Sequence, residues 1–298
     1  MEPAGSNSKK GGKSMATFTN QAALAYNNIV TNSNTVAGEI VEVLSATKTP
    51  ISASYAPDDV ITYAISIVNT GTAAFTNLTV SDNLGAYTFG ATSVTPLSYE
   101  AGTVKYYVNG VLQTAPTVTA GPPLTFTGIS VPAGGNALIL YSARANSYAP
   151  LGTGGTVENT VTITGSGVTA PVTTTGTIDA TTAARLSLTK AVSPASVSEN
   201  QPITFTLTVA NSGGSAVTAA DNAVISDTFN PPLTITSVTY NGVAWTAPTN
   251  YTYNAATGAF ATVAGQITVP AATYTQDTTT GVWETAPGIG TLVITGTM

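Results

Sequence analysis

Lysine and aspartate side chains, which can pair with or pass protons to each other, recur at matching places along the sequence. The lysines Lys48 and Lys190 end the related strings VLSATK and RLSLTK. Further along, the aspartates Asp82 and Asp227 end the related strings LTVSD and AVISD. A lysine inside a weakly charged protein is costly unless it is paired or chemically altered. The repeated lysine and aspartate are therefore the first candidates for a functional site.

Each pair of lysine and aspartate has an asparagine as a third candidate residue. Asn159 lies in the string VENTVTI, and Asn20 lies in the matching string FTNQAAL. Burial lowers the pKa of a lysine, which gives a neutral amine nucleophile. Burial also raises the pKa of an aspartic acid, which can then polarise an amide and carry protons. The amine can attack the amide carbon of the asparagine, so that ammonia leaves and an isopeptide bond stays.

This chemistry predicts two bonds of different kinds, one within a chain and one between copies. Either bond forms only once, so it is a single-turnover autocatalysis and the chain is not predicted to be an enzyme in the usual sense. A second interpretation stays open, in which each Lys–Asp pair is a salt bridge and the asparagine lies in a turn, because perturbed pairs are often only structural. The two predicted sets are Lys48, Asn159 and the assisting acid Asp82 within the chain, and Lys190, Asn20 of a neighbouring copy and the assisting acid Asp227 between copies.

Strands must position these side chains. Residues 60–67 (VITYAISI) and 202–209 (PITFTLTV) carry a large apolar side chain at every second position, which is typical of half-buried strands. Each is followed by a turn, Asn69-Thr-Gly or Asn211-Ser-Gly. Asn-Gly pairs stand in hairpin position within the related strings YYVNGVLQTAPT and TYNGVAWTAPT. The fold class predicted from this repetition is all-β, with two tandem immunoglobulin-like β-sandwiches and an N-terminal donor strand segment.

The second copy of the repeat lacks the closing segments that end the first copy. After ALILYSARA (137–145), the first copy continues through VENTVTITGSG and VTAPVTTTGTIDA, whereas the second copy ends with the matching TLVITGTM (291–298). A similar pair of segments stands at the front of the chain. The predicted parts are a disordered leader (1–16), donor strands (17–42), module 1 (43–180) and an incomplete module 2 (181–298).

A sandwich without its closing strands exposes its core and its strand edges, and each buried unpaired backbone group costs about 1–3 kcal/mol. A free pair of strands is only marginally stable. We therefore expect the front strands of one copy to close module 2 of the next by strand addition. Because this contact is heterologous, it builds a filament or a ring rather than a closed dimer. Truncation of the chain or re-pairing within it is the alternative.

Composition removes several classes of function. The 298 residues include no histidine and no cysteine, so disulfides, thiol catalysis and catalytic triads with either residue are excluded. Charged residues make up 7% and the net charge is −6, which predicts no nucleic-acid partner. No apolar run has membrane-spanning length and no classical signal peptide is visible. We expect no cofactor and no metal site. The Lys/Gly/Ser-rich residues 1–14 are either an added leader or a native tail.

The strings LSxTK, ITYxIxIVNTG, LTVSDNLG and VENTVTI resemble the bacterial conserved-repeat domain of unknown function, an immunoglobulin-like repeat of surface proteins. The opening MATFTNQAALAYNN is similar to the major spore-appendage proteins of clostridia-type spore formers. The resemblance implies a structural subunit of an extracellular fibre on a spore or cell surface. Its expected partners are other copies of itself and, further, appendage or spore-coat proteins. The alternative is a cell-surface adhesin or glycan-binding module that uses the loops at the sandwich ends.

Overall fold

The chain is all-β, as predicted. The computed structural model describes residues 16–40, 42–198 and 200–298, and within them one short 3-10 helix, η1 (Ala219–Asp221), interrupts the strands. The predicted leader therefore lies outside the described residues except for Ala16, which begins the first strand. Among the described helices, none has the length and apolar character needed to cross a membrane.

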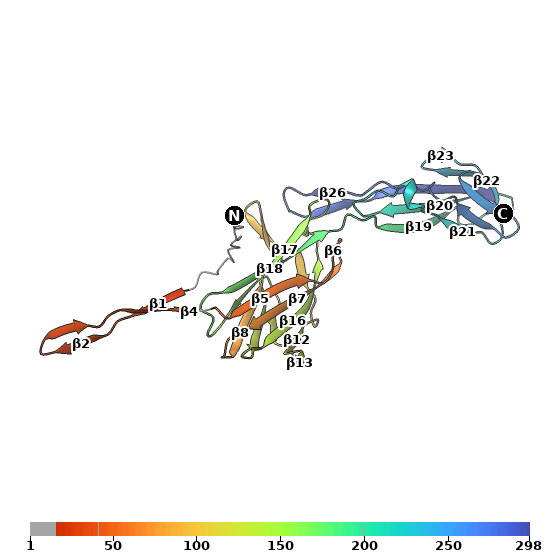
Figure 1. Cartoon of the computed structure of the whole chain (residues 1–298). Helices are drawn as coiled ribbons and strands as arrows, with labels where there is room; N and C mark the ends of the chain where they lie inside the picture. The colour runs from red at the N-terminus through yellow and green to blue at the C-terminus, as the bar shows by residue number, and fades with distance from the viewer. Residues whose placement is uncertain (1–15, 41, 199) are drawn as a thin grey trace, which may run out of the picture.

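The front of the chain forms a long two-stranded ribbon that projects from module 1 (Figure 1). The outer part of the ribbon ends in a tight turn, and the inner part leads into module 1. Residues 17–37 are all exposed. The ribbon pairs β1 (Ala16–Asn20) with β4 (Val36–Ile40), and β2 (Ala23–Tyr26) with β3 (Ile29–Asn32), all antiparallel. We call residues 16–40 the N-terminal hairpin.

Module 1 is a sandwich of two large sheets. The alternation of apolar and polar residues turns one side of each strand inward, as in β7, whose burial alternates from residue to residue. The first sheet has the order β13 (Val111–Gln113), β12 (Lys105–Val108), β16 (Asn136–Ala145), β7 (Val60–Asn69) and β5 (Leu44–Pro50), with β11 (Leu97–Tyr99) also on β16. The second has the order β14 (Thr117–Thr119), β15 (Leu124–Val131), β8 (Phe75–Asp82), β17 (Thr156–Thr164), β18 (Val172–Ala180) and β6 (Ser54–Tyr55). A small hairpin pairs β9 (Tyr87–Phe89) with β10 (Thr92–Val94).

Module 2 repeats the first sheet of module 1 and only part of the second. Its large sheet has the order β19 (Leu186–Ser193), β20 (Pro202–Asn211), β28 (Gly288–Thr297), β22 (Thr234–Tyr240) and β23 (Val243–Ala244). Its other sheet has three strands, β21 (Ser226–Thr228), β25 (Ala259–Thr262) and β24 (Tyr251–Asn254). By position, β21 corresponds to β8. On the side of β21 where β8 pairs with β17, no described strand is present.

The expected turns are present in both modules. Asn109-Gly110 joins β12 to β13, and Asn241-Gly242 joins β22 to β23, all with positive φ as the tight hairpin turn requires. The amide of the repeated Asn69 donates to the carbonyls of Ala73 and Pro132, at 2.8 and 2.9 Å. Asn211 donates in the same way to the carbonyls of Ser215 and Pro270, so the repeated asparagines join loops as well as forming the expected turns.

An arm of module 2 contacts module 1. It pairs β26 (Thr273–Gln276) with β27 (Trp283–Ala286) and is inserted directly before the last strand, where module 1 has a short turn (Figure 1). Tyr274 and Trp283 of this arm pack against the hydrophobic core of module 1. The backbone N–H of Trp283 donates to the carbonyl of Ser147 at 2.7 Å. Both contacts hold the two modules together.

Candidate functional site

A lysine and a carboxylate lie together inside module 1. Lys48 on β5 and Asp82 at the end of β8 both point into the core, and their side chains are 0% exposed. The Nζ of Lys48 lies 2.6 Å from Oδ2 of Asp82. Aromatic rings cover the ammonium group, with the centroids of Tyr63 and Tyr141 at 4.9 and 5.6 Å. The predicted Lys–Asp pair is therefore formed within module 1, away from water.

Burial changes the protonation of this lysine. Loss of hydration lowers the pKa of Lys48 from 10.5 to about 8, although the charge of Asp82 and its hydrogen bond act in the opposite direction. A lower pKa makes the neutral amine easier to reach, and only the neutral amine has a lone pair with which to attack a carbonyl carbon. The environment of Lys48 thus suits a nucleophile as well as an ion pair.

The asparagine predicted for this set is beside the pair. Asn159 lies on β17 and is 0% exposed, and both polar atoms of its side-chain amide form hydrogen bonds. Its Nδ2 donates to the hydroxyl of Tyr141 at 2.9 Å, and its Oδ1 accepts from the backbone N–H of Gly85 at 3.2 Å. The N–H of Gly85 is aimed at the oxygen on which negative charge would develop if an amine attacked the amide carbon.

Tyr141 links the acid to the amide. Its hydroxyl donates to Oδ2 of Asp82 at 2.5 Å, and the other oxygen of Asp82 accepts from the N–H of Leu84 at 2.9 Å. Burial, and then the charge of Asp82, raise the pKa of Tyr141 well above 10, so its hydroxyl keeps its proton. Sequence reasoning missed Tyr141 and Gly85. The available signal was a tyrosine at an inward position of an alternating strand, because a buried tyrosine hydroxyl normally needs a polar partner.

Module 2 forms only part of the corresponding set. The Nζ of Lys190 lies 2.5 Å from Oδ2 of Asp227, over the rings of Phe205 and Phe229. Here the lysine side chain is 39% exposed and the aspartate 15%. Asn20, the predicted third member, lies on the N-terminal hairpin, where it pairs with Val36. A single chain therefore brings together Lys190 and Asp227 but not Asn20.

The open side of module 2 is an apolar groove. It has a volume of about 170 Å³ and is lined by Leu186, Ser187, Leu188, Val209, Ala223, Val224, Ile225 and Ile267. In module 1, the residue that corresponds to Leu186 is Leu44, which is 4% exposed, whereas Leu186 is 47% exposed. All of β19 is exposed in this way, although its sequence matches that of β5. We call this surface the acceptor groove.

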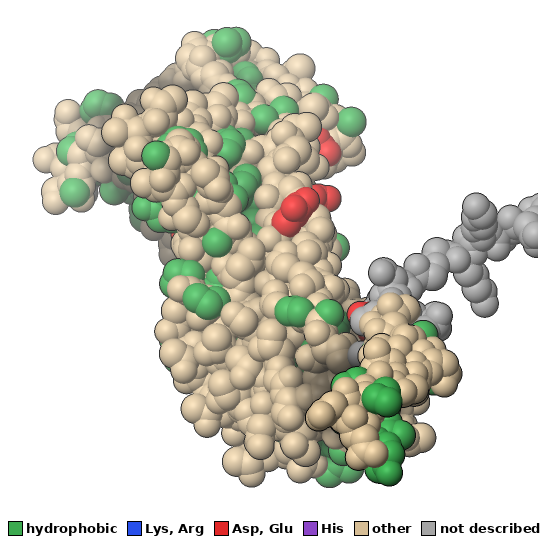
Figure 2. Space-filling view, turned by 90° about the vertical axis from the view of Figure 1, so that its left-hand side faces the viewer, with side chains coloured by type: hydrophobic (Ala, Val, Ile, Leu, Met, Phe, Trp, Pro, Cys, Tyr) green, Lys and Arg blue, Asp and Glu red, His purple; other side chains and the backbone are tan. Residues whose placement is uncertain are grey.

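The N-terminal hairpin carries apolar side chains that have no core of their own. Figure 2 shows hydrophobic side chains on the surface of this projecting segment, in a view with few charged groups. Exposed large apolar side chains that gather on one segment are typical of a contact site. The exposed apolar residues of the hairpin are Phe18, Leu24, Tyr26, Ile29, Val30 and Val36.

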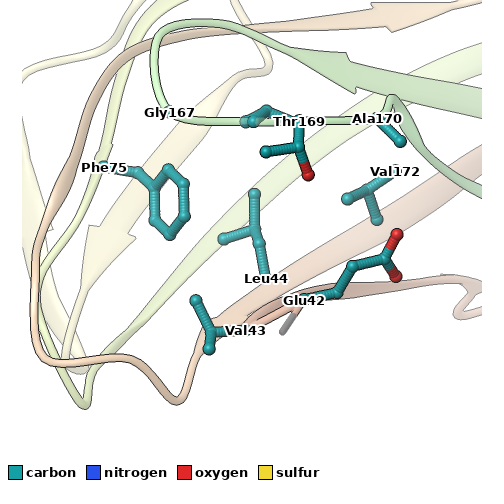
Figure 3. Close-up of a pocket in the computed structure, with 9 residues that line it drawn as sticks. Glu42, Val43, Leu44, Phe75, Gly167, Thr169, Ala170 and Val172 are labelled. Atoms are coloured by element: carbon teal, nitrogen blue, oxygen red, sulfur yellow. The ribbon is translucent and has the colours of Figure 1, made fainter. Parts of the chain in front are cut away.

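A separate pocket lies where the hairpin enters module 1. It is a small cavity of about 60 Å³, into which Leu44, Phe75 and Val172 point (Figure 3). The carboxylate of Glu42 lies at its edge beside Val172 (Figure 3). None of the residues around the Lys48 amine lines it, so this pocket is not part of the candidate site.

No protein-family model and no curated protein matches the chain. Similar solved structures include the pilus backbone protein RrgB of Streptococcus pneumoniae, with 13% identity, a TM-score of 0.33, and coverage of 86% of this chain and 50% of that chain. They also include a 35 kDa C-terminal fragment of the major pilin GBS80 of Streptococcus agalactiae, with 12% identity, a TM-score of 0.35, and coverage of 75% and 79%. The major pilin SpaD of Corynebacterium diphtheriae has 12% identity, a TM-score of 0.34, and coverage of 74% and 49%. The chain thus spans about half the length of RrgB and SpaD, and the likeness is too distant to carry a functional argument.

Proposed function

We propose that this chain is the structural subunit of an extracellular fibre, in which the N-terminal hairpin of one copy fills the acceptor groove of the next. The observation that carries the proposal is the difference between β5 and β19. These strands share the string LSxTK, yet Leu44 and Lys48 of β5 are buried within module 1, whereas every residue of β19 is exposed. The strands that complete the core of module 1 are β17 and β18. The N-terminal hairpin has the sequence and the form of such a closing pair.

The match extends to the side chains that point inward. In module 1, every second residue of β17 is buried against the core, beginning with Val157. The same spacing in the hairpin, begun at Phe18, presents apolar side chains and one asparagine. Covering one such large apolar side chain contributes about 1.5–3 kcal/mol. The aligned inward positions are Val157, Asn159, Val161 and Ile163 in β17, and Phe18, Asn20, Ala22 and Leu24 in the hairpin.

The arrangement favours pairing between copies. In Figure 1 the hairpin projects from module 1 on the side away from module 2. A donor on module 1 and an acceptor on module 2 produce a heterologous head-to-tail contact, which builds a filament or a ring rather than a closed dimer. The fibre is proposed to lie outside the cell, on a spore or cell surface, as the resemblance of the sequence implies.

Covalent bonds are proposed to lock this fibre. Within module 1, Lys48 is joined to Asn159. In the filled acceptor groove, Lys190 is joined to Asn20 of the entering hairpin, with Asp227 assisting. Support comes from module 1, where the closing strand brings an asparagine to the buried Lys–Asp pair. Each bond releases one ammonia.

The first test separates assembly from cross-linking. Purified protein is examined by native light scattering and, after boiling in detergent, on a denaturing gel. Wild type is expected to form polymers that persist as a ladder after boiling. Lys190→Arg is expected to polymerise natively and to run as a monomer after boiling, because arginine keeps the charge but is not a nucleophile at neutral pH.

Two controls make the result specific. Lys105→Arg changes an exposed lysine elsewhere in module 1 and should behave as wild type. A protein without residues 16–40 should be monomeric in both measurements. A native monomer for wild type would refute strand donation, whereas an unchanged ladder for Lys190→Arg would refute the bond between copies.

A further inference from the structure

We infer that Tyr141 is a catalytic residue of the bond within module 1 and carries a proton from Asp82 to the departing nitrogen of Asn159. This inference rests on the cross-link proposed above. Tyr141 was not among the residues that the sequence singled out. Its hydroxyl touches both groups: it donates to Oδ2 of Asp82 at 2.5 Å and accepts from Nδ2 of Asn159 at 2.9 Å.

The position of the hydroxyl is fixed by packing. Tyr141 lies on the central strand β16 and is 0% exposed. Its ring stacks on Tyr63 with centroids 5.6 Å apart and packs at an angle against Phe126 at 5.5 Å. A fully buried side chain that packs against two rings cannot swing away, so the hydroxyl stays between the acid and the amide. A proton donor held at hydrogen-bond distance from a leaving group is what general acid catalysis requires.

The reaction between Lys48 and Asn159 moves protons in a defined order. Lys48 begins as an ammonium group and Asp82 as a carboxylate. Asp82 accepts one proton from Nζ, and the freed lone pair attacks Cγ of Asn159 while the N–H of Gly85 binds the oxygen that becomes negative. Asp82 then passes its proton to the oxygen of Tyr141 as the phenol passes its own proton to Nδ2.

The C–N bond to Nδ2 breaks and ammonia leaves. A second proton moves from the former amine nitrogen to Asp82. The products are the new amide, ammonia and neutral Asp82, and Tyr141 regains its original form. Charge balances, since the ammonium and carboxylate of the start become two neutral groups, and no oxidant or cofactor is consumed.

Module 2 lacks this hydroxyl in its own chain. Across β16 and β7, Tyr141 stands opposite Tyr63. At the corresponding place across β28 and β20, Ile294 stands opposite Phe205. The relay is therefore a property of the module 1 site. It distinguishes the bond within a chain from the bond between copies.

The test follows the reaction in time. Full-length protein is made by cell-free translation, stopped in denaturant at intervals, and analysed by peptide mass for a fragment that joins Lys48 to Asn159. Tyr141→Phe removes only the hydroxyl and is expected to slow linkage by about 10²-fold or more. Tyr106→Phe is the matched control, because the hydroxyl of this tyrosine makes two hydrogen bonds to Ser130 away from the site. This variant should link at the wild-type rate.

A second variant covers the case in which Tyr141→Phe does not fold. Replacement of Tyr141 by a fluorinated tyrosine, whose phenol is more acidic, keeps the hydroxyl and should raise the linkage rate, which a purely structural role would not do. Equal rates for Tyr141→Phe and wild type would overturn the relay while the cross-link stands. If wild type never shows the joined fragment, the cross-link within module 1 fails and the relay fails with it.

Discussion

At the scale of single residues, the two lysines show how the same sequence signature can have two environments. Lys48 is sealed in a core, whereas Lys190 is partly open to solvent over Phe205 and Phe229. An exposed ion pair contributes only about 0–1 kcal/mol, so Lys190 and Asp227 gain little stability from each other in a lone copy. A strand that covers this pair would bury it, as Lys48 and Asp82 are buried in module 1. Docking should therefore precede reaction at Lys190.

A pH dependence of stability follows from Lys48. In Asn159→Ala the bond within module 1 cannot form, so Lys48 keeps its free amine. The pKa of this amine is about 8 in the folded protein and 10.5 when unfolded, so the unfolded chain binds more protons between these values. The free energy of unfolding should thus rise as the pH rises from about 8 to 10.5 and should be flat just below 8.

Urea unfolding of Asn159→Ala across this pH range measures the effect. The comparison protein is Asn159→Ala with Lys48→Met, in which the titrating amine is gone and the rise should be absent. The same rise in both proteins would show that Lys48 is not its source. Wild type should show no such rise if Lys48 is already an amide.

At the scale of elements, the closing strand β18 shows how closely two strands must approach at the site. Gly176 pairs with Asn159 in the β17–β18 ladder, and a Cβ atom built on it would lie 3.0 Å from the carbonyl oxygen of Lys48. Such a contact is tighter than most in proteins, so the backbone would have to move. Glycine is thus required here by the nearness of β5 and not by a special φ.

Gly176→Val should therefore separate β18 from β5. We expect module 1 to lose about 1–3 kcal/mol of stability, the usual cost of overpacking, and the Lys48–Asn159 linkage to slow. Thr177→Ala, at the neighbouring exposed position, should leave both unchanged. Thermal unfolding and the joined-fragment assay described above give the two readouts. A fully linked, equally stable Gly176→Val would mean that β18 does not lie where the structure has it.

The elements also show what sequence alone could and could not predict. The all-β class, the strands and the Asn-Gly turns follow from alternation and turn chemistry, which are local. The offset repeat also located Lys48, Asp82 and Asn159, which the structure links through an ion pair and the hydroxyl of Tyr141, and their roles in a cross-link stay a prediction. The bridge through Tyr141 could not be predicted, because it depends on which neighbours face one inward position across two sheets. The arm formed by β26 and β27 was not predicted either, since residues 272–287 have no counterpart in the first copy of the repeat.

At the scale of the whole molecule, the exposure of the N-terminal hairpin does not by itself distinguish a strand donor from a tail without function. What distinguishes a donor is that the same molecule carries on module 2 an apolar groove beside the exposed strand β19. The hydrophobic cores of both modules are built without residues from the N-terminal hairpin. A copy that lacks residues 16–40 should therefore fold and keep an acceptor groove, but it should have nothing to donate.

This asymmetry predicts how such a copy acts on growing fibres. Without its hairpin it cannot enter the groove of another copy, but its own groove can receive one hairpin, so it occupies only one end of a fibre. Mixed with wild type, it should shorten the fibres seen by electron microscopy. The mean number of subunits in a fibre should be about the inverse of the molar fraction of the truncated copy. After boiling, a tagged copy should appear once in each band of the ladder. The matched mixture uses the same truncation with Lys190→Arg, which should shorten native fibres equally but carry no tag into the ladder. If the truncated copy is incorporated throughout the fibre, or leaves fibre length unchanged, growth does not proceed through the hairpin.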